Sequence, residues 1–328
     1  MKALFITTET NETPKYPESF ACVNGNEVRH IIFHHRAIPG VLGGEALNNM
    51  LIDEAKDYKP DVIIYLGACA GNIPSVKTFA KLNSEFAPTV LMCSDAADVV
   101  SPWTYLLSQY DKAKAFSCVV AIDGNRNWEF SDRHLTLLTP IDPARYPSPP
   151  IPHAERKIPF GFAGNMGSFK AMKNGLPAGR RNLIAQMSVY GLQCRQRDDS
   201  FDPNLPHSES YQGCCDFISQ TRIMPNFCET GSYERHHVKG RVVEVGLAGT
   251  MLLEQINSPA HKWFEKDVDY IEFRDTRHAK TIVAQYRDKP DETQKFGDRL
   301  RAKMMAEHTP EKFWGKVMER VNDIRAVA

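Results

Sequence analysis

The sequence lacks an apolar run long enough to cross a membrane. Its most apolar stretch, Val242 to Leu253, is interrupted by Glu244 and two glycines, whereas a transmembrane helix needs about 20 predominantly apolar residues. The first residues, MKALFITTET, contain only a short apolar stretch, too short for the core of a secretion signal. We therefore expect a cytoplasmic protein without a membrane span, and we interpret these first residues as a strand.

The sequence also lacks an excess of either charge. Forty Lys and Arg residues balance forty Asp and Glu residues, so the formal net charge is zero. Without a net positive field, neither nucleic acid nor an anionic membrane surface is attracted to the protein as a whole. We therefore expect no nucleic-acid partner.

Cysteine pairs with the spacing of a metal or redox site are absent. The eight cysteines are scattered and none forms a CxxC motif, which argues against a disulfide scaffold and against a zinc site. Cys214 and Cys215 are adjacent, but neighbours on a helix do not face each other. We expect reduced thiols, no bound metal and no cofactor.

What the sequence does contain is an alternation of short apolar runs with amphipathic stretches. This alternation is typical of an α/β fold in which helices flank a parallel sheet. In the first half it predicts strands at Lys2–Ile6, Val28–Phe33, Asp61–Leu66, Thr89–Cys93, Cys118–Ile122 and Leu135–Leu138. The clearest helix is Gly44–Asp57, whose apolar residues share one face and which Pro60 ends.

A proline-rich segment divides the chain. Seven prolines fall between Thr139 and Pro159, so this segment is neither a helix interior nor a central strand. The length, 328 residues, suits two domains with a cleft between them. We predict an N-terminal Rossmann-like domain, a linker, a C-terminal Rossmann-like domain and a terminal helix that could pack back on the first domain, at residues 1–140, 141–157, 158–308 and 309–328.

The same alternation continues after the linker. It predicts strands near Ile158–Ala163, Thr221–Met224, Thr250–Leu253 and Asp269–Phe273, and helices near Gly179–Tyr190 and His237–Leu247. The terminal helix begins at Pro310, with Thr309 as its cap. Because open α/β sheets bind ligands at the carboxyl ends of their strands, the loops that follow these strands are the candidate sites.

The most informative residue is Glu244, which lies inside the apolar run VVEVGL. A helix here would be apolar nearly all round and hence buried, and a buried carboxylate is costly unless it is paired or strongly hydrogen-bonded. One explanation is that the carboxylate accepts both hydroxyls of a ribose. The alternatives are an ion pair with Lys239 or Arg241, or a helix edge turned to water.

Glycines and arginines nearby suit a diphosphate. Gly246 and Gly249 leave room either for a ligand to approach the backbone or for a helix to pack tightly on a strand. Gly164 opens a glycine loop after a predicted strand, and Arg180 and Arg181 begin the next helix. Arginine forks and helix-start amides bind phosphate oxygens, and a solvated surface is the alternative for each arginine.

A longer pattern resembles a known family. The string VKGRVVEVGLAGTMLLEQ, followed by WFEKDVDYIEF, a helix and AEHTPEKF, is similar to the C-terminal domain of the CgeB-like, spore-maturation-type glycosyltransferases. The likeness covers roughly Ile158 to Met318. The first half is similar more loosely, through KPDVIIYLG, TVLMCSDAAD with Trp103 after it, and PIDPARYP.

The resemblance implies a GT-B fold and the transfer of a sugar from a nucleotide-diphosphate sugar, such as a UDP-sugar, to a carbohydrate or other small acceptor. It implies that Glu244 holds the ribose and that backbone from Gly246 through Ala248 to Gly249 meets the diphosphate. Lys239 and Arg241 belong to the same motif. The paired-glutamate pattern of related enzymes has an acidic residue eight positions before Glu244, where this sequence has His236, so a sugar-hydroxyl contact there is in doubt.

The first domain should supply the acceptor site and, for an inverting reaction, a general base. Asp95 and Asp98 follow a predicted strand at its carboxyl end, and Asp95 is the preferred base, with a helix N-cap as its alternative role. His34 and His35 also end a strand and titrate near neutral pH, so His35 is the second candidate. Glycines at 40, 43 and 44 form a loop that could face the diphosphate.

Two rival functions remain open at this point. Asp267-Val268-Asp269 spells the Asp-x-Asp of metal-dependent glycosyltransferases, but it precedes a strand near the end of the chain, and we expect catalysis without a protein-bound metal. The other rival is a nucleotide-sugar or glycan-binding protein without turnover, which the departure at His236 favours.

Overall fold

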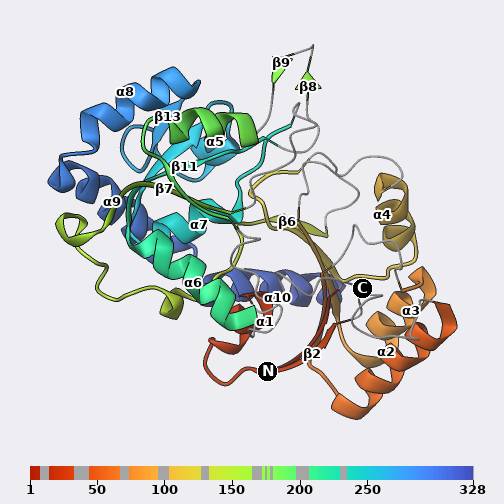
Figure 1. Cartoon of the computed structure of the whole chain (residues 1–328). Coiled ribbons are helices and arrows are strands. Elements are labelled where there is room, and N and C mark those ends of the chain that lie inside the picture. Colours follow the sequence, from red (N-terminus) through yellow and green to blue (C-terminus); the bar gives the residue numbers. More distant parts are fainter. Residues whose placement is uncertain are drawn as a thin grey trace. The chain divides into compact units, whose positions relative to one another are not determined.

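The computed structural model describes residues 1–7, 15–32, 44–66, 74–94, 103–126, 133–164, 172–173, 176–177, 180–196, 207–229 and 235–327. The chain divides into two compact units (Figure 1). Unit 1 comprises Met1–Asp142 and Thr309–Ala328, and unit 2 comprises Pro143–His308. Each unit is an α/β domain built on its own parallel sheet.

The sheet of unit 1 has six parallel strands in the order β2-β1-β3-β4-β5-β6. The strands are β1 (Lys2–Thr7), β2 (Glu27–Ile32), β3 (Val62–Leu66), β4 (Thr89–Cys93), β5 (Cys118–Ala121) and β6 (His134–Thr136). All six strands expected from the sequence are confirmed. Central strands such as β1, β3 and β4 are buried on both faces, which explains why they are continuous apolar runs rather than alternating ones.

Helices cover both faces of this sheet. The helices of unit 1 are α1 (Lys15–Ala21), α2 (Gly44–Tyr58), α3 (Val76–Lys81) with a π-helical turn (Leu82–Phe86), α4 (Trp103–Lys112) and α10 (Pro310–Val327). Alternate residues of β1 enter two cores: Leu4 packs with residues of α2 and α3, and Phe5 with residues of α1 and α10. Trp314 of α10 is the centre of the second core, where its indole donates to Ser19 Oγ at 3.2 Å.

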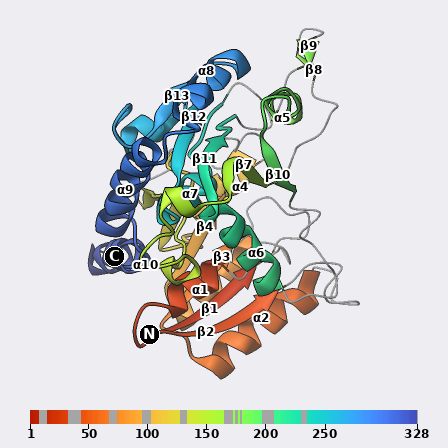
Figure 2. The ribbon, with the colours of Figure 1, turned by 60° about the vertical axis from the view of Figure 1, so that its left-hand side comes forward.

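Unit 2 has five parallel strands in the order β10-β7-β11-β12-β13. Figure 2 shows β12, β11, β7 and β10 in this order. The strands are β7 (Ile158–Gly164), β10 (Gln193–Gln196), β11 (Thr221–Asn226), β12 (Met251–Gln255) and β13 (Ile271–Phe273). A separate antiparallel pair joins β8 (Met172–Lys173) and β9 (Leu176–Pro177). The helices are α5 (Arg180–Ser188), α6 (His207–Ser219), α7 (Gly240–Leu247), α8 (Thr276–Tyr286) and α9 (Pro290–Glu307), with short 3-10 turns at Pro143–Arg145, His153–Glu155 and Pro259–Lys262.

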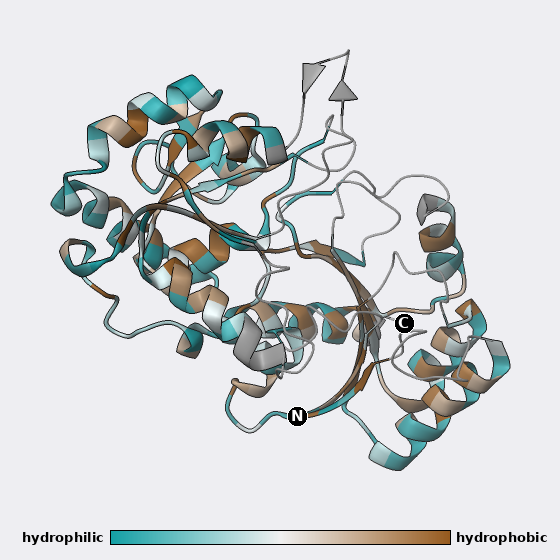
Figure 3. Ribbon diagram, viewed as in Figure 1, coloured by the Kyte–Doolittle hydropathy of each residue, from teal (hydrophilic) through white to brown (hydrophobic). Residues whose placement is uncertain are grey.

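The predicted elements of unit 2 are confirmed with shifted ends, and several others, among them β10 and α6, were missed. Helix α7 begins three residues after His237, because Lys239 at its N-cap has extended backbone (φ −63°, ψ 148°). Strand β10 and helix α6 were not predicted, since LQCRQ is short and polar and α6 carries few large apolar residues. Figure 3 shows the apolar residues gathered on the strands and on the helix surfaces that face them.

No helix among the described residues is both long and apolar enough to span a bilayer.

Candidate functional site

The strand order of unit 2 directs attention to the gap between β7 and β11. From β7 the chain proceeds outward to β10, and it returns on the other side of β7 to build β11, β12 and β13. The place where the strand order reverses in this way is the switch point of the sheet. Open sheets bind ligands there, at the carboxyl ends of the strands. Paired residues between β11 and β7 end at Ile223 and Phe160, so the last residues of β11 and β7 separate at this edge.

Gly164 ends β7 at this edge, and Arg241 lies against it. Gly164 has φ +144°, a conformation that favours glycine, and a Cβ atom placed on it would lie 3.3 Å from Arg241 Nη2. The missing side chain therefore makes room for the guanidinium. The structure brings together these two predicted residues, which are far apart in the sequence.

Arg241 pairs with Glu244 one turn further along α7. Its Nη1 atom lies 2.6 Å from Glu244 Oε2, and Tyr211 of α6 donates to Glu244 Oε1 at 3.1 Å. Glu244 is only 5% exposed. The predicted ion pair with Arg241 is thus present, and the alternative of a helix edge turned to water is wrong, because the whole of α7 from Val242 to Leu247 is buried.

The charges around this pair are strongly coupled. Burial lowers the pKa of Arg241, but the charge of Glu244 and smaller contributions from Cys214, Tyr146 and Tyr211 together raise the pKa above its usual range. Burial, and then the charge of Glu244, hold the pKa of Tyr211 well above its usual range, which keeps its hydroxyl protonated as a donor. The Arg145 guanidinium lies over the Tyr211 ring at 5.0 Å. An ionised carboxylate has about four acceptor positions, so Glu244 retains acceptor capacity beyond these two partners.

The glycines at the other end of α7 have a different role from the one expected. A crossover helix in a parallel sheet starts near the carboxyl end of one strand and ends near the amino end of the next, so Gly246, Ala248 and Gly249 lie away from the carboxyl edge. A Cβ atom on Gly246 would meet Met304 Cγ of α9 at 2.6 Å. The Ala248 and Gly249 carbonyls accept from Arg156 Nη2 at 2.8 and 3.1 Å. The expected diphosphate contact by these three residues is corrected: they pack α9 and cap α7.

This packing role predicts the effect of Gly246→Ala. The added methyl group is expected to lower the free energy of unfolding by about 1–3 kcal/mol, because it overpacks the contact with Met304 and Leu300. Gly315→Ala in α10 is the matched control, since a Cβ there meets nothing within 4 Å and alanine favours a helix by up to about 1 kcal/mol. Urea unfolding of both variants is the measurement. Equal stability of the two variants would contradict the packing role.

His236 and Lys239 lie between β11 and the start of α7. His236 forms an isolated antiparallel bridge with Glu229, and the Gln255 side chain donates from Nε2 to Glu229 Oε1 at 2.9 Å. Lys239 stands at the N-cap of α7, and its charge acts on Glu254 and Cys228. Both predicted residues are therefore on the carboxyl side of the sheet.

A buried polar pair at the same edge was missed by sequence reasoning. Asn226, the last residue of β11, is the register partner of Glu254 in β12 and donates from Nδ2 to both carboxyl oxygens at 3.0 and 2.9 Å. Glu254 is fully buried, and burial raises its pKa to about 8. The available signal was a carboxylate inside the apolar strand MLLEQ.

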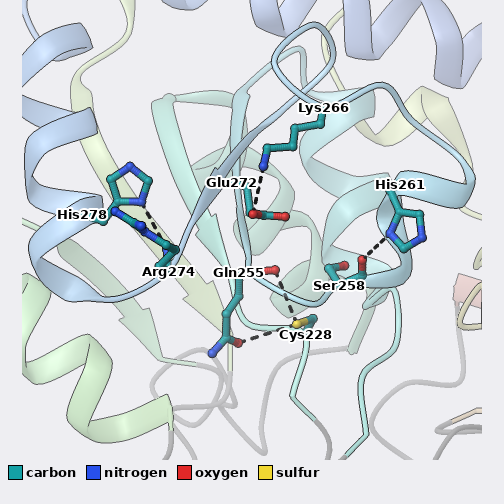
Figure 4. Close-up of polar contacts among 8 residues, drawn as sticks. All are labelled: Cys228, Gln255, Ser258, His261, Lys266, Glu272, Arg274 and His278. Atoms are coloured by element: carbon teal, nitrogen blue, oxygen red, sulfur yellow. Dashed lines mark hydrogen bonds and ion pairs between the residues drawn. The ribbon is translucent and has the colours of Figure 1, made fainter.

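Polar contacts also join residues that follow β11, residues at the end of β12 and residues around β13 (Figure 4). The Cys228 thiol points to the Gln255 carbonyl and side-chain oxygens at 3.7 and 3.8 Å, and Lys266 donates to Glu272 at 3.1 Å. Asp269 accepts from the Glu265 backbone N–H at 2.8 Å and lies 3.5 Å from Lys303 Nζ. Asp269 therefore closes a turn rather than facing a ligand with Asp267, and within the described ranges no cluster of three or more His, Cys, Asp or Glu could hold a metal ion.

Several predicted residues lie outside the described part of the chain. They are Asp95, Asp98, His34, His35 and the glycines at 40 and 43. The backbone of Arg180 and Arg181 forms the first turn of α5, but their side chains are not described. Gly44, at the start of α2, has φ +74° and open space beside it. The seven described cysteines are free thiols, including the Cys214 and Cys215 pair on α6.

The fold is that of the GT-B glycosyltransferases, as comparison with solved structures shows. HepE from Anabaena, solved with UDP and glucose, has a TM-score of 0.61 and 14% identity over 98% of this chain and 100% of that one. Sucrose-phosphate synthase from Thermosynechococcus elongatus has a TM-score of 0.62 and 12% identity over all of both chains. A glycosyltransferase from Rickettsia africae has a TM-score of 0.62 and 11% identity over 98% of each.

The match to a family model covers a shorter part of the chain than the matches to solved structures. A family model described as glycosyl transferase-like matches residues 178–319, a segment that contains Glu229, Arg241, Glu244 and Glu254. No curated protein sequence matches the chain. The chain thus has the GT-B fold, and its residues 178–319 are similar to the glycosyl transferase-like family model.

Proposed function

We propose that this protein is a CgeB-like glycosyltransferase that takes a hexose from a UDP-sugar and passes it to a hydroxyl group of a carbohydrate or other small acceptor. The observation that carries the proposal is the buried Glu244 carboxylate, held by Arg241 and Tyr211 beside the switch point of the sheet. It lies inside the segment that the glycosyl transferase-like model matches. HepE, of the same fold, was solved with UDP and glucose and with UDP-glucose.

The donor is proposed to bind in unit 2. A carboxylate suits a ribose because its two oxygens accept two hydroxyls, and Glu244 has acceptor capacity to spare. Arg241 next to Gly164 supplies a guanidinium for the diphosphate, with Arg181 at the start of α5 as a further candidate. The general base that would remove the acceptor's proton in an inverting reaction is proposed to come from unit 1, as Asp95 or His35.

The reaction is proposed to need no metal bound by the protein. The support is the engagement of Asp269 with the Glu265 backbone and Lys303, which leaves the Asp-x-Asp sequence without two converging free carboxylates. Chelation with EDTA is expected to leave turnover unchanged. A large loss that Mg²⁺ or Mn²⁺ restores would favour the metal-dependent rival. The cytoplasmic location remains a prediction from the sequence.

The first experiment is a thermal-shift screen with UDP, UDP-glucose and UDP-galactose. A ligand that binds only the folded state at a hundred times its dissociation constant stabilises by about 2.7 kcal/mol, so a clear rise in Tm is expected for UDP and for one UDP-sugar. No rise with any of them would contradict the proposal. A bound structure with the nucleotide anchored only before Thr139 would contradict binding in unit 2.

Release of UDP from the bound donor then separates an enzyme from a binding protein. Slow hydrolysis to UDP and free sugar is expected even without acceptor, because water can replace the acceptor hydroxyl. A donor that binds tightly but stays intact over a long incubation would favour the binding protein without turnover.

A further inference from the structure

The structure assigns a second carboxylate to the donor: we infer that Glu229 binds hydroxyl groups of the transferred hexose. This inference rests on the proposed function. It concerns a residue that follows β11 by three positions, on the carboxyl side of the sheet and at the strand that borders the switch point.

The backbone brings Glu229 and His236 side by side. The two residues form an antiparallel bridge, and the His237 N–H donates to the Cys228 carbonyl at 3.1 Å. The chain therefore leaves the sheet edge at Glu229 and returns to it at His236. Glu229 and His236 thus occupy paired backbone positions, although they are seven positions apart in the sequence.

The side chain of Glu229 is held in one orientation. Gln255, which is 6% exposed at the end of β12, donates from Nε2 to Glu229 Oε1 at 2.9 Å. The Gln255 side-chain oxygen in turn lies 3.8 Å from the Cys228 thiol (Figure 4). Because the thiol is a donor toward this oxygen, the amide nitrogen of Gln255 faces Glu229.

One carboxyl oxygen remains for a ligand. Among the described residues, no side chain donates to Glu229 Oε2, and the residue is only partly buried. A free carboxylate oxygen accepts hydrogen bonds and repels phosphate, so on a nucleotide-sugar it suits hydroxyl groups. The ribose hydroxyls are already assigned to Glu244 on α7. The hydroxyls left for Glu229 are those of the hexose.

A metal ion is a poorer occupant of this position. A cation would need further oxygen ligands, whereas Glu229 Oε1 already faces the donor amide of Gln255. The described residues place no other carboxylate in a three-member cluster with it.

The test compares UDP with UDP-glucose on the same variants. Glu229→Gln can turn its own carbonyl oxygen toward Gln255 and so keep that hydrogen bond, but it replaces the free oxygen by an NH₂ group. The affinity for UDP-glucose, measured by calorimetry, is expected to fall about ten- to a hundredfold, the loss of one charge-assisted hydrogen bond. The affinity for UDP is expected to stay within about twofold of wild type, because UDP has no hexose.

Glu292→Gln is the control, an exposed carboxylate that pairs with Lys295 in the first turn of α9, and it should alter neither affinity. If Glu229→Gln fails to fold, Glu229→Asp, which keeps the charge but shortens its reach, should show the same loss confined to UDP-glucose. Equal losses for UDP and UDP-glucose, or none for either, would overturn the inference while leaving UDP binding by unit 2 intact. A wild-type protein that binds neither ligand would instead refute the proposed function itself.

Discussion

Replacing Glu244 with glutamine is expected to lower the free energy of unfolding by about 3–5 kcal/mol even without a ligand, because removing one partner of a buried ion pair leaves the other charge uncompensated. The stranded group is the Arg241 guanidinium, whose Nη1 lies 2.6 Å from the carboxylate. The Tyr211 hydrogen bond survives, since the amide oxygen of glutamine can still accept it. Urea unfolding measures this loss.

Donor binding is expected to weaken in the same variant. A charge-assisted hydrogen bond contributes about 1.5–3 kcal/mol, so Glu244→Gln should bind UDP about ten- to a hundredfold more weakly at a temperature where it remains folded. Unchanged UDP affinity together with the large loss of stability would remove Glu244 from the site and leave it as the structural partner of Arg241.

The double variant Glu244→Gln with Arg241→Met separates the two roles. Replacing a whole buried ion pair by neutral groups is often close to neutral for stability, so the double variant should recover most of the lost free energy of unfolding. Its UDP affinity should remain low, because neither charge is present to bind the donor. Recovery of UDP binding along with stability would show that the nucleotide contacts neither residue.

Glu254→Gln is expected to remove a large pH dependence of stability. Burial raises the pKa of Glu254 to about 8 in the folded protein, against 4.5 for an exposed glutamate. The folded state therefore holds its proton more tightly than the unfolded state. The resulting stability is fully present below pH 4.5, falls as pH rises toward 8 and stays low above it, a total on the order of 5 kcal/mol.

The comparison to make is urea unfolding of wild type and Glu254→Gln between pH 5 and pH 9. Glutamine is neutral throughout and can still accept a hydrogen bond from Asn226. Between pH 5 and pH 9 the free energy of unfolding of the variant should therefore rise by several kcal/mol relative to that of the wild type. Glu292→Gln, at an exposed site paired with Lys295, should leave the wild-type slope in place. Parallel curves for wild type and Glu254→Gln would show that Glu254 is ionised in the folded protein at neutral pH.

The elements that could be predicted from the sequence share a strong local pattern. The central strands β1, β3 and β4 of unit 1 were found because their residues are buried on both faces, so each is an almost continuous apolar run. The start of the last helix was found because Thr309 and Pro310 are local signals. Strand β10 and helix α6 were missed because their residues are polar or small, and their structure depends on packing against β7 and its neighbours.

In the candidate site, too, some residues were found from local patterns and the roles of others needed the structure. Glu244 was found because a carboxylate in an apolar run needs a partner, which is a local argument. The nature of that partner needed the structure, since Tyr211 lies 33 residues away on α6. The roles of the glycines at 246 and 249 also needed it, because residues distant in the sequence fill the space beside them: Met304 beside Gly246, and Pro150 and Arg156 beside Gly249.

The sequence by itself determined the class of fold and directed attention to the buried carboxylate of Glu244, because hydrophobic periodicity and the cost of a buried charge are properties of neighbours along the chain. Tertiary structure alone decided which residues share the carboxyl edge of the second sheet. Glu229, Gln255 and Asn226 with Glu254 come from separate strands and loops, and strand pairing at a distance is what joins them. A parallel sheet places the ends of strands that are remote in sequence at one edge, and no local pattern encodes that meeting.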